Sequence, residues 1–262
     1  MTDITLNDEY KSIAMMQQIL DKPLTILYRD EHLIAVHKPE GLLVHRSNID
    51  KSETRFLLQM LRDQVGEYLY PIHRLDKPSS GLILFGFNAC VTAHIKKQME
   101  SNTATKEYLL ICRGYTPDSG IIDHPLKPID DFKSKTQRVK NTKPSQEAVT
   151  EFTRLDTIEL DVEVDKYPCS RYSLVQAKIL TGRRHQIRRH MKHISHPIIG
   201  CPKYGKSVHN RYFADTYQVP RLLLHAYKMT LEHPVSGQPL TILSKPQGSF
   251  KSLIDRFGWY LP

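Results

Sequence analysis

Apolar residues recur along this chain mainly with the spacing of β-strands. Short apolar or alternating runs bounded by Gly, Pro, Asn or Asp are typical of strands, and they cover residues 24–28, 33–36, 70–76, 82–87, 105–112, 148–155, 158–164, 172–180, 222–231 and 240–243. Helical spacing occurs at residues 1–23, 54–65, 88–99, 182–193 and 249–257. Because strands outnumber helices without a regular βαβ alternation, the pattern predicts an α+β fold, a mixed or antiparallel sheet with helices packed on it.

Turn residues and caps divide these elements. The polar residues between the strands at 24–28 and 33–36 predict a β-hairpin. The helix at 54–65 is expected to be capped by Ser52 or Thr54 and to stop at Gly66. We expect residues 1–23 to be an N-terminal extension and residues 24–262 to be one domain.

The composition indicates a polyanionic partner. The chain of 262 residues has 37 Lys and Arg against 28 Asp and Glu, a formal net charge of +9, which favours nucleic acid first and an acidic membrane surface second. Residues 127–147 are polar and rich in Lys and Arg. This segment is interpreted with equal weight as a solvated insertion or as a loop that contacts RNA.

The cellular setting follows from what the sequence lacks. No run of about 18 apolar residues is present, so no membrane span is expected. The first twenty residues carry acids rather than a basic region and an apolar core, which argues against a signal peptide. The four cysteines form no C-x-x-C pair, as expected for reduced thiols: Cys90, Cys112, Cys169 and Cys201. We therefore expect a cytoplasmic protein.

A first chemical candidate is Asp76, which ends an extended segment at the turn Lys-Pro-Ser-Ser-Gly. Strand alternation puts Arg74 and Asp76 on one face, so a guanidinium and a carboxylate could share one cleft. The alternative is that the Asp76 carboxylate only accepts hydrogen bonds from the amides of Ser79 and Ser80, and the turn alone favours this alternative.

A second candidate is the basic stretch at residues 181–193, which has five Lys or Arg. Ile187 and Met191 would face the core, while Arg184, Arg188 and Lys192 form a cationic row. Adjacent like charges repel, so phosphate contacts explain this row better than a merely solvated face.

Other chemistries are less well supported by the motifs. The histidines at 185, 190, 193 and 196 lack an H-E-x-x-H arrangement and clustered carboxylates, so no metal site is expected. Ser79 and Ser80 lack the G-x-S-x-G elbow of a serine hydrolase.

Taken together, these motifs resemble the RluA family of pseudouridine synthases over about residues 24–258. The resemblance is carried, in order, by Lys-Pro-Glu-Gly at 38–41, His-Arg-Leu-Asp at 73–76 with Ser-Ser-Gly at 79–81, Lys-Glu-Tyr at 106–108, Thr-Gly-Arg-Arg-His-Gln-Ile-Arg at 181–188, His-Pro-Ile-Ile-Gly at 196–200 and Arg-Leu-Leu-Leu-His-Ala at 221–226. It implies the pseudouridine synthase fold, a bisected, mostly antiparallel sheet with an RNA-binding cleft across it. The segments near 188–200 and 257–259 look most like a branch that modifies uridine 65 of tRNA.

The family's chemistry implies roles for particular residues. Asp76 would be the nucleophile that attacks the ribose C1′ or assists cleavage of the glycosidic bond, so that the uracil can rotate and rejoin through C5. Arg183 would pair with Asp76, and Tyr108 would stack on the base and take the C5 proton. Arg74 would fill the place of the flipped uridine in the RNA. Phosphate or sugar contacts are implied for His185, Gln186, Arg188 and Arg189.

The resemblance also implies which partners the protein has, and two residues depart from the family's usual pattern. We expect tRNA as the partner, no cofactor, no metal, a monomer, and no small S4-type RNA-binding domain ahead of the catalytic one. Ser79 and Cys201 replace residues that are usual in the family, and neither change is expected to affect the chemistry. Three alternatives stay open: a synthase acting on 23S ribosomal RNA or another tRNA uridine, a non-catalytic RNA-binding protein and, more distantly, a metal-dependent hydrolase.

Overall fold

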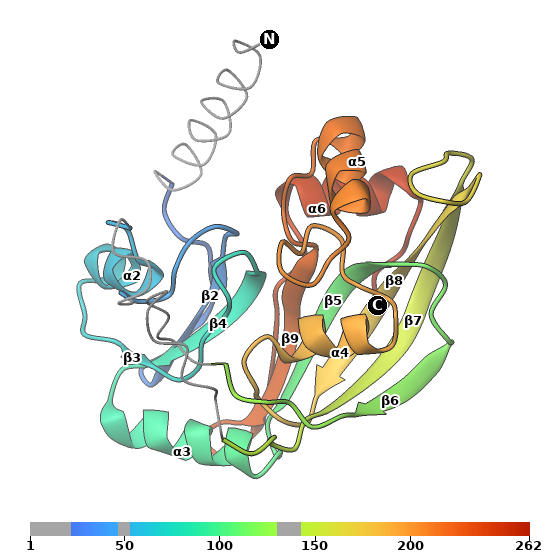
Figure 1. Cartoon of the computed structure of the whole chain (residues 1–262). Coiled ribbons are helices and arrows are strands. Elements are labelled where there is room, and N and C mark those ends of the chain that lie inside the picture. Colours follow the sequence, from blue (N-terminus) through green and yellow to red (C-terminus); the bar gives the residue numbers. More distant parts are fainter. Residues whose placement is uncertain (1–21, 47–52, 130–142) are drawn as a thin grey trace, which may run out of the picture.

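A computed structural model describes residues 22–46, 53–129 and 143–262 (Figure 1). The helix expected near the N-terminus, the cap expected at Ser52 and the most basic part of residues 127–147 lie largely or wholly outside the described residues. Among the described residues no helix is both long and apolar enough to cross a bilayer.

Ten strands form one sheet in the described part of the chain. They are β1 (Ile26–Arg29), β2 (Leu33–Lys38), β3 (Tyr70–Pro71), β4 (Ser80–Gly86), β5 (Thr105–Arg113), β6 (Ser119–Asp123), β7 (Val149–Leu160), β8 (Ser170–Ile179), β9 (Leu224–Glu232) and β10 (Pro239–Leu243). The order is β1-β2-β4-β9-β5-β8-β7-β6, with β3 also paired to β4 and β10 to β9. The predicted α+β fold with a mostly antiparallel sheet is confirmed.

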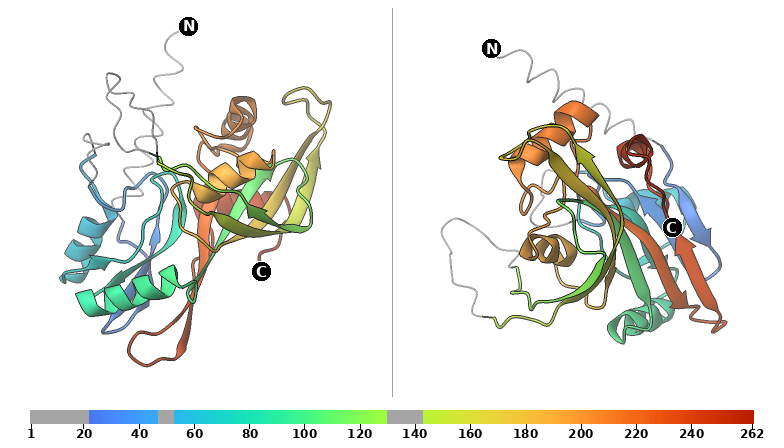
Figure 2. Two further views of the ribbon diagram at one scale, coloured as in Figure 1. Left: turned by 60° about the horizontal axis from the view of Figure 1, so that its bottom comes forward. Right: turned by 90° about the vertical axis from the view of Figure 1, so that its right-hand side faces the viewer.

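The sheet is divided where β4 meets β9. These two strands are parallel and pair through only two positions, Ser80 with His225 and Gly81 with Ala226. Gly81 has φ +110°, and a Cβ there would lie 2.2 Å from the Ala226 carbonyl oxygen, so only glycine allows the join. Figures 1 and 2 show the halves on either side, β1 to β4 in one and β5 to β8 in the other. The join comes directly after the turn that carries Asp76.

Five helices flank the sheet in the described residues: α2 (Leu57–Val65), α3 (Ala89–Glu100), α4 (Gln186–His193), α5 (Ser207–Tyr217) and α6 (Gly248–Arg256). In Figure 1, α2 and α3 lie beside the half with β1 to β4, and α4 lies in front of the other half. The stop of α2 at Gly66, in a left-handed conformation, is confirmed. Its N-cap is Phe56, without a side-chain hydrogen bond, so the expected Ser or Thr cap is wrong.

Several elements differ from the sequence prediction for identifiable reasons. The two strands expected at 148–155 and 158–164 are one strand, β7, because a bulge between Arg154 and Asp156 shifts the register without ending the pairing. The helix α5 and the strand β6 were not predicted. Each presents few apolar residues to the core: α5 buries His209 and Phe213, and β6 buries Ile122.

The extended segment at 70–76 pairs only as β3. One edge of β4 is taken by β2 over Gly81 to Gly86, so β3 and β9 share the other edge and meet opposite ends of it. In the gap between them, the amide of Leu84 donates to Nε2 of His73 at 3.2 Å. The His73 ring thus takes the place of a strand partner, and the segment from 72 to 79 leaves the sheet toward α4.

Candidate active site

A cavity of about 360 Å³ lies between the turn before β4, the start of β5 and the N-terminal end of α4. Seven of the eight predicted site residues line it: Arg74, Asp76, Tyr108, Arg183, His185, Gln186 and Arg188. Its volume is in the range of small-ligand sites. The structure therefore brings the two sequence motifs together at the division of the sheet.

Asp76 is not a turn cap. The amide of Ser79 donates to the main-chain oxygen of Asp76 at 3.1 Å, not to its carboxylate, and in the part of the chain that the structure describes the Ser80 amide makes no hydrogen bond to that carboxylate. Among the described residues, the hydrogen bond to the carboxylate comes from Arg188 Nη1, 2.8 Å from Oδ2. The other oxygen, Oδ1, lies 3.8 Å from His185 Nε2, which is too far for a hydrogen bond. One carboxylate oxygen thus stays available to a ligand.

The ion pair expected between Arg183 and Asp76 is made by Arg188 instead. Arg183 precedes α4, and its Nε donates to the carbonyl of Glu147 at 2.8 Å. Arg188 lies within α4 with a side chain only 4% exposed. Its Nε also contacts Sγ of Cys201, which departs from the family pattern, at 3.4 Å. In this structure the Arg188 guanidinium therefore contacts Asp76 and Cys201, and the phosphate or sugar contact expected for it stays a prediction.

The other residues predicted to bind substrate differ in whether their side chains can contact a ligand in the cavity. The Gln186 amide nitrogen donates to the Val149 carbonyl and the Thr150 hydroxyl. Its oxygen accepts from the Thr181 hydroxyl and the Arg183 amide. Gln186 therefore fixes the start of α4 rather than offering hydrogen bonds to a ligand. Arg189 does not line the cavity, and its Nη1 donates to the carbonyl of Lys127 at 2.9 Å.

His185 begins α4 in a left-handed conformation, with φ 55°. Its Nδ1 lies 3.1 Å from the Tyr204 hydroxyl. Burial lowers the pKa of His185 to about 4, although the negative charge of Asp76 acts to raise it. The imidazole is therefore neutral near pH 7 and can offer a ligand one donor or one acceptor.

The walls beside Asp76 carry an aromatic ring and a further cation. Tyr108, on β5, is 8% exposed, and burial, followed by the charge of Asp76, raises the pKa of its phenol. Lys106, two residues earlier on the same strand, also lines the cavity, and burial lowers the pKa of its amine. Arg74 is exposed at the rim and also lines a smaller cavity of about 150 Å³.

Lys38 holds the turn at Lys77 through its buried side chain, a role that the sequence did not predict. The side chain is fully buried, and Nζ donates to the carbonyls of Pro39, Leu42 and Lys77 at 2.8, 2.7 and 3.1 Å. Burial lowers the pKa of Lys38 to about 7. A lysine beside Pro and Gly is ordinarily exposed, so nothing in the local sequence signalled this contact.

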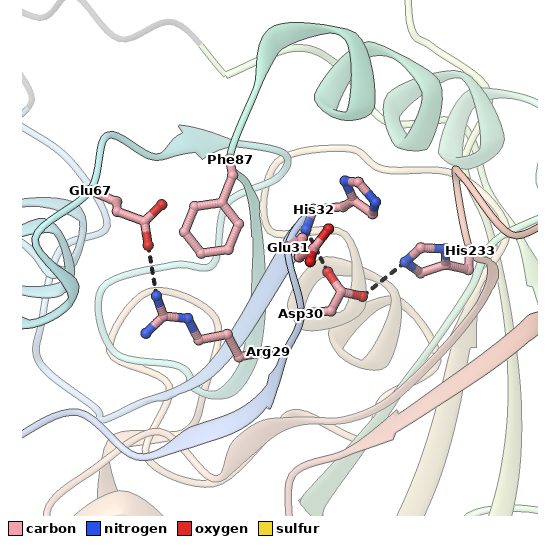
Figure 3. A pocket seen from close by; sticks show the side chains of 7 residues that line it. All are labelled: Arg29, Asp30, Glu31, His32, Glu67, Phe87 and His233. Carbon is pink, nitrogen blue, oxygen red and sulfur yellow. Dashed lines mark hydrogen bonds and ion pairs between the residues drawn. The ribbon is translucent and has the colours of Figure 1, made fainter.

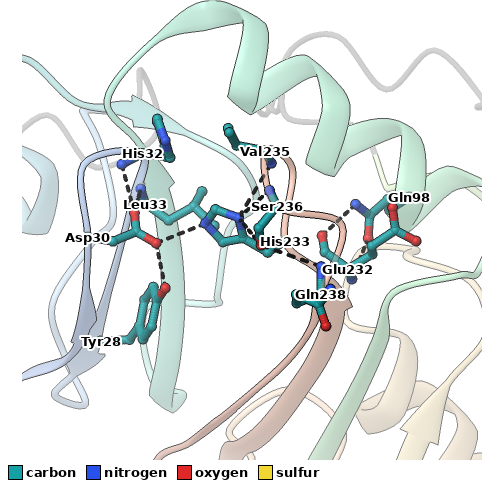
Figure 4. Close-up of polar contacts among 10 residues, drawn as sticks. All are labelled: Tyr28, Asp30, His32, Leu33, Gln98, Glu232, His233, Val235, Ser236 and Gln238. Carbon is teal, nitrogen blue, oxygen red and sulfur yellow. Dashed lines mark hydrogen bonds and ion pairs between the residues drawn. The ribbon is translucent and has the colours of Figure 1, made fainter.

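A second carboxylate, Asp30, shows what a structural aspartate looks like in this protein. It borders a cavity of about 830 Å³ near the β1–β2 turn (Figure 3). Its oxygens accept hydrogen bonds from the Tyr28 hydroxyl, from the amides of His32 and Leu33 at 2.7 Å each, and from His233 at 2.9 Å (Figure 4). Burial opposes ionisation of Asp30, but these hydrogen bonds outweigh it and lower the pKa. Since both of its oxygens are occupied, the Asp30 carboxylate is not available to a ligand in this larger cavity.

Replacement of Asp30 by Ala is expected to lower the free energy of unfolding by about 2–3 kcal/mol, because two amides and His233 lose their acceptor. Urea unfolding would measure the change. Glu31→Ala is the matched control, since Glu31 is exposed beside it and exposed substitutions stay within about 0.5 kcal/mol. Equal stability of the two variants would contradict the structural role of Asp30.

Buried neutral histidines join the two halves of the sheet. His225 Nε2 lies 2.7 Å from the Ser244 carbonyl and Nδ1 lies 2.8 Å from the Ser80 hydroxyl. His37 Nδ1 lies 2.9 Å from the Ser244 hydroxyl. Burial lowers the pKa of His37 to about 4 and that of His225 to about 3.

Stability should therefore fall in mild acid. Above about pH 6.5 both rings are neutral in the folded and the unfolded chain. Below that pH the unfolded chain binds protons that the folded protein excludes, so stability is lost as pH falls from about 6.5 toward 4, by about 1.4 kcal/mol per pH unit for each ring. Urea unfolding of His37→Asn between pH 7.5 and 5 should show a shallower slope than wild type, whereas exposed His94→Asn should not. An unchanged slope in His37→Asn would contradict this explanation.

The described residues contain no group of three or more His, Cys, Asp or Glu side chains arranged to hold a metal ion. The four cysteines carry free thiols.

The sequence matches the family model described as RNA pseudouridylate synthase over residues 32–193. A protein named tRNA pseudouridine synthase C from Pasteurella multocida is 46% identical over 239 residues, covering 91% of this chain and 98% of that protein. One of the same name from Pectobacterium carotovorum is 43% identical over 237 residues, covering 90% of this chain, which spans only 62% of that protein.

Among solved structures, the chain is similar to Human RNA Pseudouridylate Synthase Domain Containing 4, with a TM-score of 0.65 and 22% identity. That match covers 97% of this chain and 99% of the human one. At this identity the similarity concerns the fold.

Proposed function

Because this chain belongs to the RNA pseudouridylate synthase family, we propose that it isomerises a uridine of tRNA, at position 65, to pseudouridine with Asp76 as the nucleophile. The observation that carries the proposal is the Asp76 carboxylate in the cavity, one oxygen held by Arg188 and the other without a hydrogen-bond donor among the described residues. The tRNA substrate is supported by the names of relatives that align along most of this chain.

The carboxylate acts on the ribose of the bound nucleotide. Asp76 adds to C1′ or assists cleavage of the bond from C1′ to N1, which frees the uracil to rotate. C5 then bonds to C1′, and any bond between the Asp76 carboxylate and C1′ breaks at this step. The proton leaves C5 and N1 gains a proton, so the product is an isomer of the substrate and the carboxylate is regenerated. Arg188 fixes the direction of the carboxylate because its guanidinium is itself held between Asp76 and Cys201.

Tyr108 forms the wall against which the base rests. Its buried phenol keeps its proton near neutral pH, since burial raises the pKa. We therefore assign Tyr108 to packing on the uracil rather than to removal of the C5 proton, which passes to water. Stacking on an aromatic side chain is a common way to hold an unstacked base.

Arg74 enters the RNA. It lies at the rim shared by the two cavities beside Asp76, and no described carboxylate pairs with it. A uridine must leave its stack to reach Asp76, and a long planar cation at the rim can occupy the vacated place. The Arg183 guanidinium lines the same cavity and contacts the phosphate or sugar of the target nucleotide.

The test is release of tritium from tRNA labelled at uridine C5, combined with mapping of pseudouridines in RNA from a strain that lacks this enzyme. The proposal expects release by the purified protein and reversion of tRNA position 65 to uridine in that strain. Reversion of a 23S ribosomal RNA position, or of another tRNA position, would overturn the assignment to position 65. A normal pseudouridine content would overturn the enzymatic assignment.

A further inference from the structure

A second cavity, of about 550 Å³, lies at the other end of α4 and shares no residue with the cavity at Asp76. It is formed by the end of β5, the loop between β7 and β8, the residues after α4 and the start of α5. Figure 1 shows the β7–β8 loop and α5 on the same side of the molecule. The helix α4 has eight residues and is about 12 Å long, so one folded RNA can reach both cavities.

The cavity combines exposed aromatic rings with guanidinium groups. The side chains of Tyr115 and Tyr167 are 40% and 62% exposed, and the Arg171 guanidinium lies 5.3 Å from the centre of the Tyr115 ring. Arg113 has its nearest carboxylate oxygen, on Asp165, at 4.0 Å, beyond hydrogen-bond distance. Rings and guanidiniums are the groups that hold the bases and phosphates of single nucleotides.

A buried imidazole in the wall has an unused nitrogen. His209 is 3% exposed and lines the cavity. Its Nδ1 lies 2.9 Å from the Tyr172 hydroxyl, whereas Nε2 has no hydrogen-bond partner among the described residues. A buried polar atom without a partner is unfavourable, and a ligand with donors and acceptors in this cavity can relieve it.

Two carboxylates, one that lines the cavity and one that pairs with a lining arginine, argue against a simple anion as the ligand. Asp165 is bound by Lys206, and Glu159 is paired with Arg171. These carboxylates offset much of the local positive charge, so a bare anion such as phosphate would gain little. A nucleotide gains affinity from stacking as well as from charge.

We propose that this cavity binds one nucleotide of the RNA substrate outside the active site, with the base on Tyr167 or Tyr115 and the phosphate on Arg113. The site deepens the proposed function, on which it rests for the RNA nature of the substrate. Its role is to add affinity and to set which uridine reaches Asp76 at the other end of α4.

The experiment measures binding apart from catalysis. In an Asp76→Asn background, the dissociation constant for total tRNA from a strain lacking this enzyme is measured by filter binding for Tyr167→Ala and for Tyr167→Ala with Arg113→Met. We expect the dissociation constant to rise about tenfold in the double variant and by a smaller factor in Tyr167→Ala. The matched control is Tyr260→Ala with Arg29→Met, which removes one ring and one guanidinium elsewhere and should leave the constant unchanged.

The results distinguish failure of the proposed nucleotide site from failure of the proposed function. Equal tRNA affinity of Tyr167→Ala, the double variant and the control, with unchanged circular dichroism, would overturn the site. Loss of adenosine 5′-monophosphate binding in the double variant without any change for tRNA would show a free nucleotide as the ligand and overturn the RNA assignment. Failure of the proposed function shows differently, as absent tritium release by the wild-type protein. With Asp76 intact, the double variant should raise KM and leave kcat within about twofold.

Discussion

Replacement of Asp76 by Asn is expected to reduce tritium release from C5-labelled tRNA by about 10⁴-fold or more, the scale seen when a nucleophile is removed. The amide is too weak a nucleophile to add at C1′. Its carbonyl can still accept the hydrogen bond from Arg188, so the turn and α4 should keep their positions. Single-turnover kinetics with saturating enzyme would measure the chemical step, and filter binding should give a dissociation constant for tRNA close to that of wild type.

The control for this substitution is Asp63→Asn, which removes a carboxylate from the exposed face of α2, where it accepts from Gln59. We expect full activity there. Asp76→Asn with activity within tenfold of wild type would rule out nucleophilic or carboxylate-assisted chemistry at this residue. Loss of tRNA binding together with activity would instead indicate that Asp76 organises the site.

Local signals in the sequence were sufficient for the framework around Asp76. The apolar run before Gly86 predicted β4, and the Pro- and Gly-containing turn predicted the reversal before it. Gly66 predicted the end of α2 because a left-handed residue is favourable there. Such features depend on neighbours in the chain, so a single sequence contains them.

Contacts between distant segments were beyond reach of the same reasoning. The early end of β3 depends on β9, about 150 residues later, which shares the same edge of β4. One of the three carbonyls that the buried Lys38 amine contacts belongs to Lys77, which is distant in the chain. His185 begins α4 in a left-handed conformation, which the spacing of residues does not predict. Spacing alone therefore placed Arg183, Gln186 and Arg188 in one site without assigning their individual contacts.

The structure makes the roles of Arg183 and Arg188 separable by mutation. Arg188→Met should lower kcat by about 10²-fold or more, because the Asp76 carboxylate loses the group that orients it and even small misplacement is costly. Arg188→Lys should recover only part of this loss, since an ammonium cannot contact Asp76 and Cys201 with the planar geometry of a guanidinium. Single-turnover rates measure this directly.

Arg183→Met is the matched comparison, because it also removes a guanidinium from this cavity. The Nε of Arg183 donates to the Glu147 carbonyl rather than to Asp76. We expect kcat to stay within about threefold and any larger effect to fall on KM, as for a contact to the substrate backbone. Circular dichroism and urea unfolding would exclude a folding defect in either variant. The reverse order of effects, a large loss of kcat in Arg183→Met and a small one in Arg188→Met, would mean that the arginines exchange partners when RNA binds and that Arg183 orients the nucleophile.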